Sequence, residues 1–162
     1  MKNLDKIFSF LDFLRELQKI ERKQYVVGEK RMENDVEHSY QLVMLCWFLI
    51  NYLDLDLDSN KVLKYALAHD LVEVYTGDTP FWDADKEGDN EKDQRERKAI
   101  KKIEDQFKNS FPELIETIKE YEKSKTVSRE GSFVYALDKL IPILNNYQGS
   151  RLDNNCASLE IC

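Results

Sequence analysis

The 162-residue sequence predicts a single all-α domain. Apolar residues recur with the three-to-four-residue spacing of amphipathic helices through most of the chain. No stretch shows the Val, Ile and Thr alternation between turn residues that would indicate a β-sheet. A chain of this length buries about 70% of its unfolded surface, which is enough for a core without disulfide bonds. We therefore expect a helical bundle over residues 1–148 and a tail without clear periodicity over residues 149–162.

The first helix is predicted from one apolar face near the N-terminus. This face consists of Leu4, Ile7, Phe8, Leu11, Leu14 and Leu17. Residues 19–35 are mixed in character and contain Gly28, so we expect a loop there. Residues 41–53 are apolar on nearly every side, which is typical of a central helix that is buried all round.

A third helix is predicted to carry the stretch YALAHDLVEVYTGD, residues 65–78. Asp58 or Ser59 can cap its start, because their side chains accept hydrogen bonds from free backbone N–H groups. Gly77 is placed to end it, since glycine tolerates the left-handed conformation that is common at helix ends.

The second half of the chain begins with an expected loop, TPFWDADKEGDN, at residues 79–90. A charged helix follows, with a narrow inner face of Ala99, Ile100, Ile103 and Phe107. Ser110 and Glu113 have capping-box spacing and are expected to open the next helix. A last long helix is expected to begin near Ser128. Its apolar positions are Phe133, Val134, Leu137, Leu140, Ile141 and Leu144.

Composition excludes several classes of protein. The formal net charge of -7 would repel a polyanion, so we expect no extended nucleic-acid partner, although small anions are compatible with it. No run of 18 apolar residues is present, so we expect no membrane span, and the N-terminal residues do not resemble a signal peptide. Three scattered cysteines, Cys46, Cys156 and Cys162, indicate a reducing compartment, and we expect a cytoplasmic protein.

Ionisable residues interrupt the apolar pattern of the third predicted helix. They are His69, Asp70, Glu73 and Asp78. A charge on a buried face loses its hydration and needs a partner or a proton. His38 lies where the central helix begins, and Asp138 lies among apolar residues of the last helix. Each residue alone could be structural, but three helices of one bundle here offer ligands that could converge on a cation.

Three segments carry a wider resemblance. They are ENDVEHSY at 33–40, AHDLVEVYTGDTP at 68–80 and EGSFVYALDKL at 130–140, with Arg22 upstream. The ordered set H…HD…E…GD…D at these spacings resembles the HD-domain superfamily of metal-dependent phosphohydrolases. Within that superfamily the chain is most similar to the small bacterial 5′-deoxynucleotidases and their eukaryotic relatives. The resemblance spans about residues 14–146, which is nearly the whole chain.

The resemblance implies an HD-type helical bundle that binds one divalent metal ion. Its implied metal ligands are His38, His69, Asp70 and Asp138. Glu73 and Asp78 are implied to be catalytic, and Arg22 is implied to bind the substrate phosphate. Imidazole and carboxylate ligands suit Mn, Co, Zn, Ni or Fe. Such an ion can lower the pKa of water from about 15.7 to about 7 and polarise a phosphoryl oxygen.

We therefore expect an enzyme that removes the 5′-phosphate of (deoxy)nucleoside monophosphates. Water attacks phosphorus in line, Glu73 orients or deprotonates it, and Asp78 assists departure of the sugar oxygen. Two alternatives stay open: hydrolysis of another nucleotide, a triphosphate or an alarmone, and a non-catalytic HD-fold binding protein. The resemblance also implies a homodimer, and the aromatic Phe81 and Trp82 could lie at its interface, cover the site or pack on their own domain.

Overall fold

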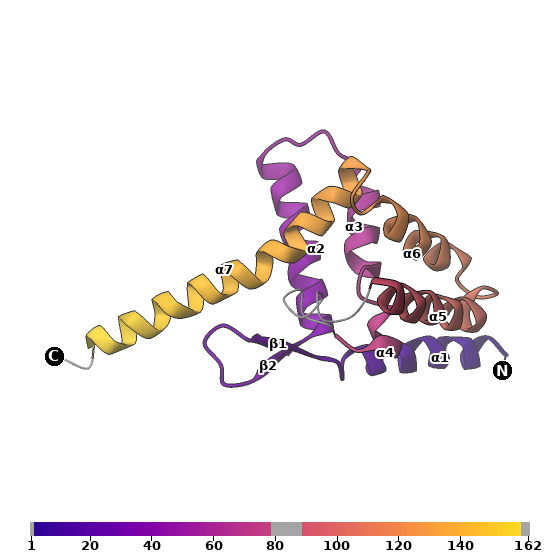
Figure 1. Cartoon of the computed structure of the whole chain (residues 1–162), viewed down its shortest axis with the longest axis horizontal. Coiled ribbons are helices and arrows are strands. Elements are labelled where there is room, and N and C mark those ends of the chain that lie inside the picture. The colour runs from indigo at the N-terminus through magenta and orange to yellow at the C-terminus, as the bar shows by residue number, and fades with distance from the viewer. Residues whose placement is uncertain (1, 79–88, 160–162) are drawn as a thin grey trace.

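The computed structural model describes residues 2–78 and 89–159 and shows a helical bundle with one small hairpin (Figure 1). Its elements are α1 (Lys2–Leu17), β1 (Glu21–Tyr25), β2 (Met32–Asn34), α2 (Asp35–Tyr52), α3 (Ser59–Ala68), α4 (Glu73–Thr76), α5 (Asp89–Phe107), α6 (Pro112–Ser124) and α7 (Arg129–Leu159). Helices dominate, so the predicted all-α fold class is confirmed. Phe81 and Trp82 lie outside the described residues, as does most of the predicted loop around them.

The hairpin corrects the predicted loop over residues 19–35. Strands β1 and β2 pair antiparallel, with Glu21 opposite Asn34, and Gly28 adopts a φ of 80° in the turn between them. The strands were not predicted, because they are short and mostly polar and lack the apolar alternation of a half-buried sheet. The hairpin carries Arg22 and Glu33, whose side chains are both largely buried.

The stretch at residues 65–78 forms two helices, where one had been predicted. Asp58 caps α3 as expected, accepting a hydrogen bond from the Lys61 N–H at 3.1 Å, but α3 ends at Ala68. Backbone bonds in the turn that follows join residues three apart, including Glu73 N to Asp70 O at 2.9 Å. In such tight turns the side chains of residues three apart eclipse, so Asp70 and Glu73 point to the same side. Gly77 ends α4 with a φ of 73°, as predicted.

Two clusters of buried apolar side chains hold the bundle together. The first packs α1 against α5, α6 and the turn after α3. The second packs α2 and α3 against α6 and α7. The predicted inner face of α5 is confirmed, with Ala99, Ile103 and Phe107 nearly inaccessible and Ile100 packed beside them.

The predicted capping box of α6 is wrong. The N-cap residue is Phe111, which makes no side-chain cap bond, and Ser110 Oγ instead donates to the Phe107 carbonyl oxygen at 3.3 Å. Pro112 occupies the first turn. Proline begins a helix without a side-chain cap because its φ is already helical and it has no N–H to satisfy.

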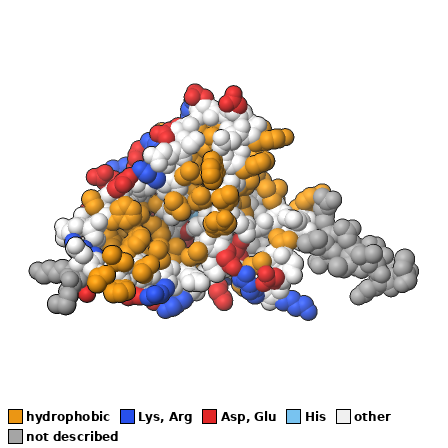
Figure 2. Space-filling model, turned by 180° about the vertical axis from the view of Figure 1, so that it is seen from behind, with side chains coloured by type: hydrophobic (Ala, Val, Ile, Leu, Met, Phe, Trp, Pro, Cys, Tyr) orange, Lys and Arg blue, Asp and Glu red, His pale blue; other side chains and the backbone are white. Residues whose placement is uncertain are grey.

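Helices α1, α2 and α7 leave apolar faces exposed. On α7 this face consists of Leu140, Ile143, Leu144 and Tyr147, and it includes two of the apolar positions named from the sequence. On α1 the residues predicted to face inward lie mostly outside: Leu4, Ile7, Phe8 and Leu11 are all more than 40% exposed, while Phe13 and Leu17 are buried. Helix α2 is buried on one side only. Its exposed side carries Tyr40, Met44, Trp47, Phe48 and Tyr52. Seen from behind, the molecule accordingly shows hydrophobic side chains over much of its surface (Figure 2).

Helix α7 continues past the predicted end of the domain at residue 148 and reaches Leu159. Its C-terminal part extends away from the rest of the bundle (Figure 1). The division into a domain over 1–148 and a tail over 149–162 stays a prediction, although its boundary falls inside a helix. None of the described helices is both long enough and apolar enough to cross a membrane.

Candidate functional site

Two histidines and two aspartates from three parts of the bundle converge on one point. His38 lies on α2, His69 and Asp70 lie at the end of α3, and Asp138 lies on α7. His38 Nε2 is 2.9 Å from Asp138 Oδ1, and His69 Nε2 is 2.8 Å from Asp70 Oδ2. One ligand atom from each residue lies within 4.8 Å of the others. The structure thus brings together all four residues that the sequence singled out as metal ligands.

The hydrogen bonding of the imidazoles suits a cation at this point. His69 Nδ1 lies 2.9 Å from the Ala66 carbonyl oxygen, which fixes the ring and turns Nε2 toward the cluster. That Nε2 is buried and has no well-aligned hydrogen bond, although Asp70 is near. A buried nitrogen without a hydrogen bond is costly unless another ligand satisfies it. Two imidazoles and two carboxylates are a donor set that divalent transition metals accept.

Within this arrangement the imidazoles balance the carboxylates. Burial lowers the pKa of His38, which favours the neutral ring that can ligate a metal. Burial also opposes protonation of His69, but Asp70 and Asp138 outweigh it and raise its pKa. Burial would raise the pKa of Asp138, yet the hydrogen bond from His38 and the charge of His69 hold that pKa well below its usual range. A cation would take over this neutralising role.

A second group of acids surrounds Arg22 beside the four-residue cluster. Arg22 Nη1 lies 3.0 Å from Asp70 Oδ2, 3.2 Å from Asp35 Oδ1 and 3.9 Å from Asp78 Oδ1. Its Nε lies 3.7 Å from Glu33 Oε2, and its side chain is only 12% exposed. The guanidinium therefore links the hairpin to the metal-ligand cluster through Asp70.

Glu73 lies in the same group of acids. Asp35, Asp70 and Glu73 each place a carboxylate oxygen within 4.8 Å of the others. Burial, followed by the charges of Asp70 and Asp35, raises the pKa of Glu73 to about 12. Burial likewise raises the pKa of Asp78, against the lowering effect of Arg22. Both predicted catalytic acids thus hold their protons more tightly than usual in the absence of a cation.

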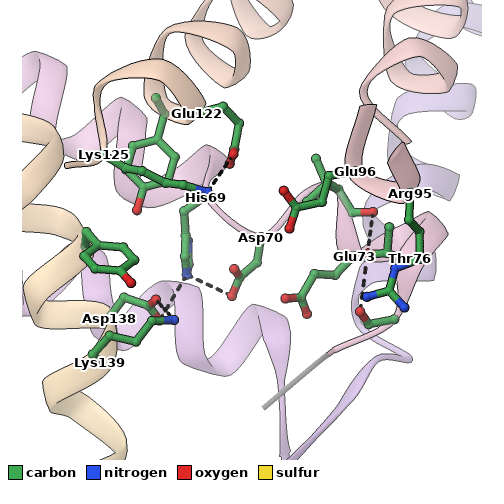
Figure 3. A pocket seen from close by; sticks show the side chains of 14 residues that line it. His69, Asp70, Glu73, Thr76, Arg95, Glu96, Glu122, Lys125, Asp138 and Lys139 are labelled. Atoms are coloured by element: carbon green, nitrogen blue, oxygen red, sulfur yellow. Dashed lines mark hydrogen bonds and ion pairs between the residues drawn. The ribbon is translucent and has the colours of Figure 1, made fainter. Parts of the chain in front are cut away.

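A cavity of about 410 Å³ opens against the cluster (Figure 3). His69, Asp70 and Asp138 form part of its wall together with Glu73. Other parts of the wall come from α5, from α6 and its C-cap residue, and from α7. They contribute Arg95, Glu96, Tyr121, Glu122, Lys125, Tyr135 and Lys139. Arg22 and Asp78 are not among the described residues that line the cavity.

Sequence analysis missed several of these residues. Glu33 and Asp35 lie within the ENDVEHSY segment, so their nearness to His38 was the available signal. Lys139 directly follows Asp138 and could have been found in the same way. Lys125 gave no signal, because it follows a charged helix and reaches the cavity only through the packing of α6 against α7.

Comparison with known proteins identifies the family of the chain. A family model described as HD domain matches residues 14–161. The chain is 29% identical to the 5′-deoxynucleotidase HDDC2 of Homo sapiens, over 94% of this chain and 74% of the relative, and 31% identical to that of Dictyostelium discoideum, over 86% and 77%. It also resembles the crystal structure of a predicted metal-dependent phosphohydrolase from Magnetospirillum magnetotacticum, with a TM-score of 0.73 and 29% identity over 90% of this chain and 71% of that one. The chain therefore belongs to the HD-domain family.

Proposed function

We propose that this protein is a metal-dependent phosphohydrolase that converts deoxynucleoside 5′-monophosphates into nucleosides and inorganic phosphate. The observation that carries the proposal is the convergence of two imidazoles and two carboxylates at one point, beside a cavity that His69, Asp70 and Asp138 line together with Glu73. The names of the relatives support the substrate class, and the solved relative supports dependence on a metal.

We assign one divalent ion, of Mn, Co, Zn, Ni or Fe, to His38, His69, Asp70 and Asp138. Their close packing and mixed nitrogen and oxygen donors support this assignment. When bound, such an ion lowers the pKa of a water molecule and polarises a phosphoryl oxygen. The remaining chemistry then falls to side chains near the cluster.

Glu73 and Asp78 are proposed to move the protons. Glu73 orients the attacking water and accepts its proton as the new P–O bond forms. The bond from phosphorus to the 5′-oxygen breaks, and Asp78 gives its proton to the departing sugar oxygen. Burial raises the pKa of Asp78, which favours the protonated form that this step needs. Arg22 Nη1 donates to Asp35 and Asp70. A contact between Arg22 and the substrate phosphate stays a prediction.

The test is phosphate release by chelator-treated protein that is given back one divalent metal at a time. Deoxynucleoside monophosphates, ribonucleoside monophosphates and nucleoside triphosphates are compared at equal concentration. We expect phosphate from the deoxynucleoside monophosphates with at least one of the proposed metals. Release from triphosphates alone would favour the other nucleotide hydrolases of the family, and no release with any metal would favour a binding protein.

Removal of one ligand provides the matched control for metal dependence. Asp138→Ala should abolish metal uptake. Added metal should then no longer raise the melting temperature, because a metal ion stabilises the fold only if it binds the folded form. Unchanged metal content in this variant would contradict the assignment of Asp138.

We also propose a cytoplasmic homodimer. The buried free thiol of Cys46 fits a reducing compartment. The exposed aromatic face of α2 offers a surface that a second copy of the chain could cover.

A further inference from the structure

Two lysines from different elements line the same cavity. Lys125 is the C-cap residue of α6, and Lys139 lies one residue after Asp138 on α7. Both line the cavity beside His69 and Asp70 (Figure 3). The cavity wall therefore holds these two positive charges in addition to that of Arg95.

Each ammonium group retains hydrogen-bonding capacity. Lys125 Nζ lies 2.7 Å from Glu122 Oε2, and Lys139 Nζ lies 2.8 Å from Asp138 Oδ2. A lysine ammonium carries three N–H donors, whereas the described hydrogen bonds occupy one on each. Two ammonium groups with spare donors at a cavity wall can both donate charge-assisted hydrogen bonds to an anion with several oxygen atoms.

Lys125 is held at this place by a close approach of two helices. Gly131, in the first turn of α7, packs so tightly on the end of α6 that a Cβ there would lie 2.7 Å from the Ser124 carbonyl carbon and 3.0 Å from Lys125 Cα. Glycine permits this contact because it has no side chain. The Gly131 N–H also donates to Ser128 Oγ at 3.0 Å, which fixes the connection between the helices.

We propose that Lys125, acting beside Lys139, contacts the phosphate group of the substrate. Arg22 is less suited to this role, since its guanidinium is nearly buried among Glu33, Asp35, Asp70 and Asp78. The identity of the substrate rests on the proposed function, but the anion site does not require turnover and can be tested by itself.

The first experiment measures binding of inorganic phosphate to manganese-loaded protein by titration calorimetry. Lys125→Ala should weaken phosphate binding by about 10- to 100-fold, the size expected for a charge-assisted hydrogen bond. Lys125→Arg should restore most of the affinity, because it keeps the charge. Lys123→Ala is the matched control: Lys123 lies two residues earlier on α6, is exposed and does not line the cavity. It should bind phosphate as the wild type does.

The second experiment separates substrate binding from catalysis. Lys125→Ala should raise KM for a deoxynucleoside monophosphate about as much as it weakens phosphate binding, with manganese content and melting temperature unchanged. The assignment would be overturned if Lys125→Ala bound phosphate as tightly as Lys123→Ala does, or if Lys125→Ala lost manganese. Failure of the wild type to hydrolyse any monophosphate would instead contradict the proposed function, while the calorimetric comparison would still decide the role of Lys125.

Discussion

Glu73 shows how a single side chain depends on the charges around it. Burial and the neighbouring Asp70 and Asp35 raise its pKa to about 12. A divalent ion held by Asp70 would oppose those negative charges and lower this pKa. A positive charge at the ligand cluster would therefore favour the carboxylate form of Glu73 that the proposed proton transfer needs. The acid group and the ligand cluster thus form one electrostatic unit.

Replacement of Glu73 by Gln tests its role in proton transfer. The amide can still hydrogen-bond to Asp35 but cannot accept the proton of water, so kcat should fall by about 10²- to 10⁴-fold. Metal content, measured by elemental analysis, should stay the same. Glu116→Gln, on an exposed site of α6, is the control and should leave kcat unchanged. Loss of metal would make Glu73 a ligand, and near-normal kcat would make it a structural acid.

Single residues were predictable from the sequence where they belong to a spaced motif. His38, His69, Asp70 and Asp138 were singled out in this way, and the structure places them together. Their role as ligands stays a proposal. Asp35 and Lys125 were not singled out. Asp35 lies close to His38 in the sequence, but its contact with Arg22 depends on the hairpin. Lys125 reaches the cavity through the corner between α6 and α7, which has no signature in the local sequence.

Among the elements, helices were predicted better than their faces. Apolar periodicity shows that a helix has an apolar face but not what covers it. Leu4 and Ile7 of α1 follow the expected spacing and are exposed, whereas Phe13, outside the predicted face, is buried. The break after Ala68 also had no signal, because residues 65–76 contain no glycine or proline that would end a helix there. In both cases packing between elements decided the outcome.

The contact between α6 and α7 can be tested with two glycines of one helix. Gly131→Ala should lower the free energy of unfolding by about 1–3 kcal/mol, because its Cβ has no room beside Ser124. Gly149→Ala, where nothing lies within 4 Å of the added Cβ, should raise it by about 0.4–1 kcal/mol through helix propensity. Urea unfolding at one fixed protein concentration measures both. Equal effects of the two variants would contradict the close approach at Gly131.

At the scale of the whole molecule, the exposed apolar faces of α1 and α2 differ in what they offer a second copy. Five large side chains of α2, four of them aromatic residues with at least half of their surface exposed, lie on one continuous stripe at three- and four-residue spacing. Aromatic side chains bury about 150–250 Å² each when covered, so at half exposure this stripe provides roughly 500 Å². A standard interface takes about 800 Å² from each partner. Helix α1 offers smaller, mostly aliphatic residues.

We therefore predict that the homodimer forms through α2. In a two-fold interface the same patch of both chains is buried, so one substitution acts twice. Trp47→Glu should place two desolvated charges at the centre of the interface and convert the dimer to a monomer in sedimentation velocity. Ile7→Glu on α1 is the matched control, because Ile7 is 54% exposed and Trp47 is 53% exposed. It should leave the dimer intact. A wild-type mass that stays monomeric at every concentration would exclude the dimer, and dissociation by Ile7→Glu alone would move the interface to α1.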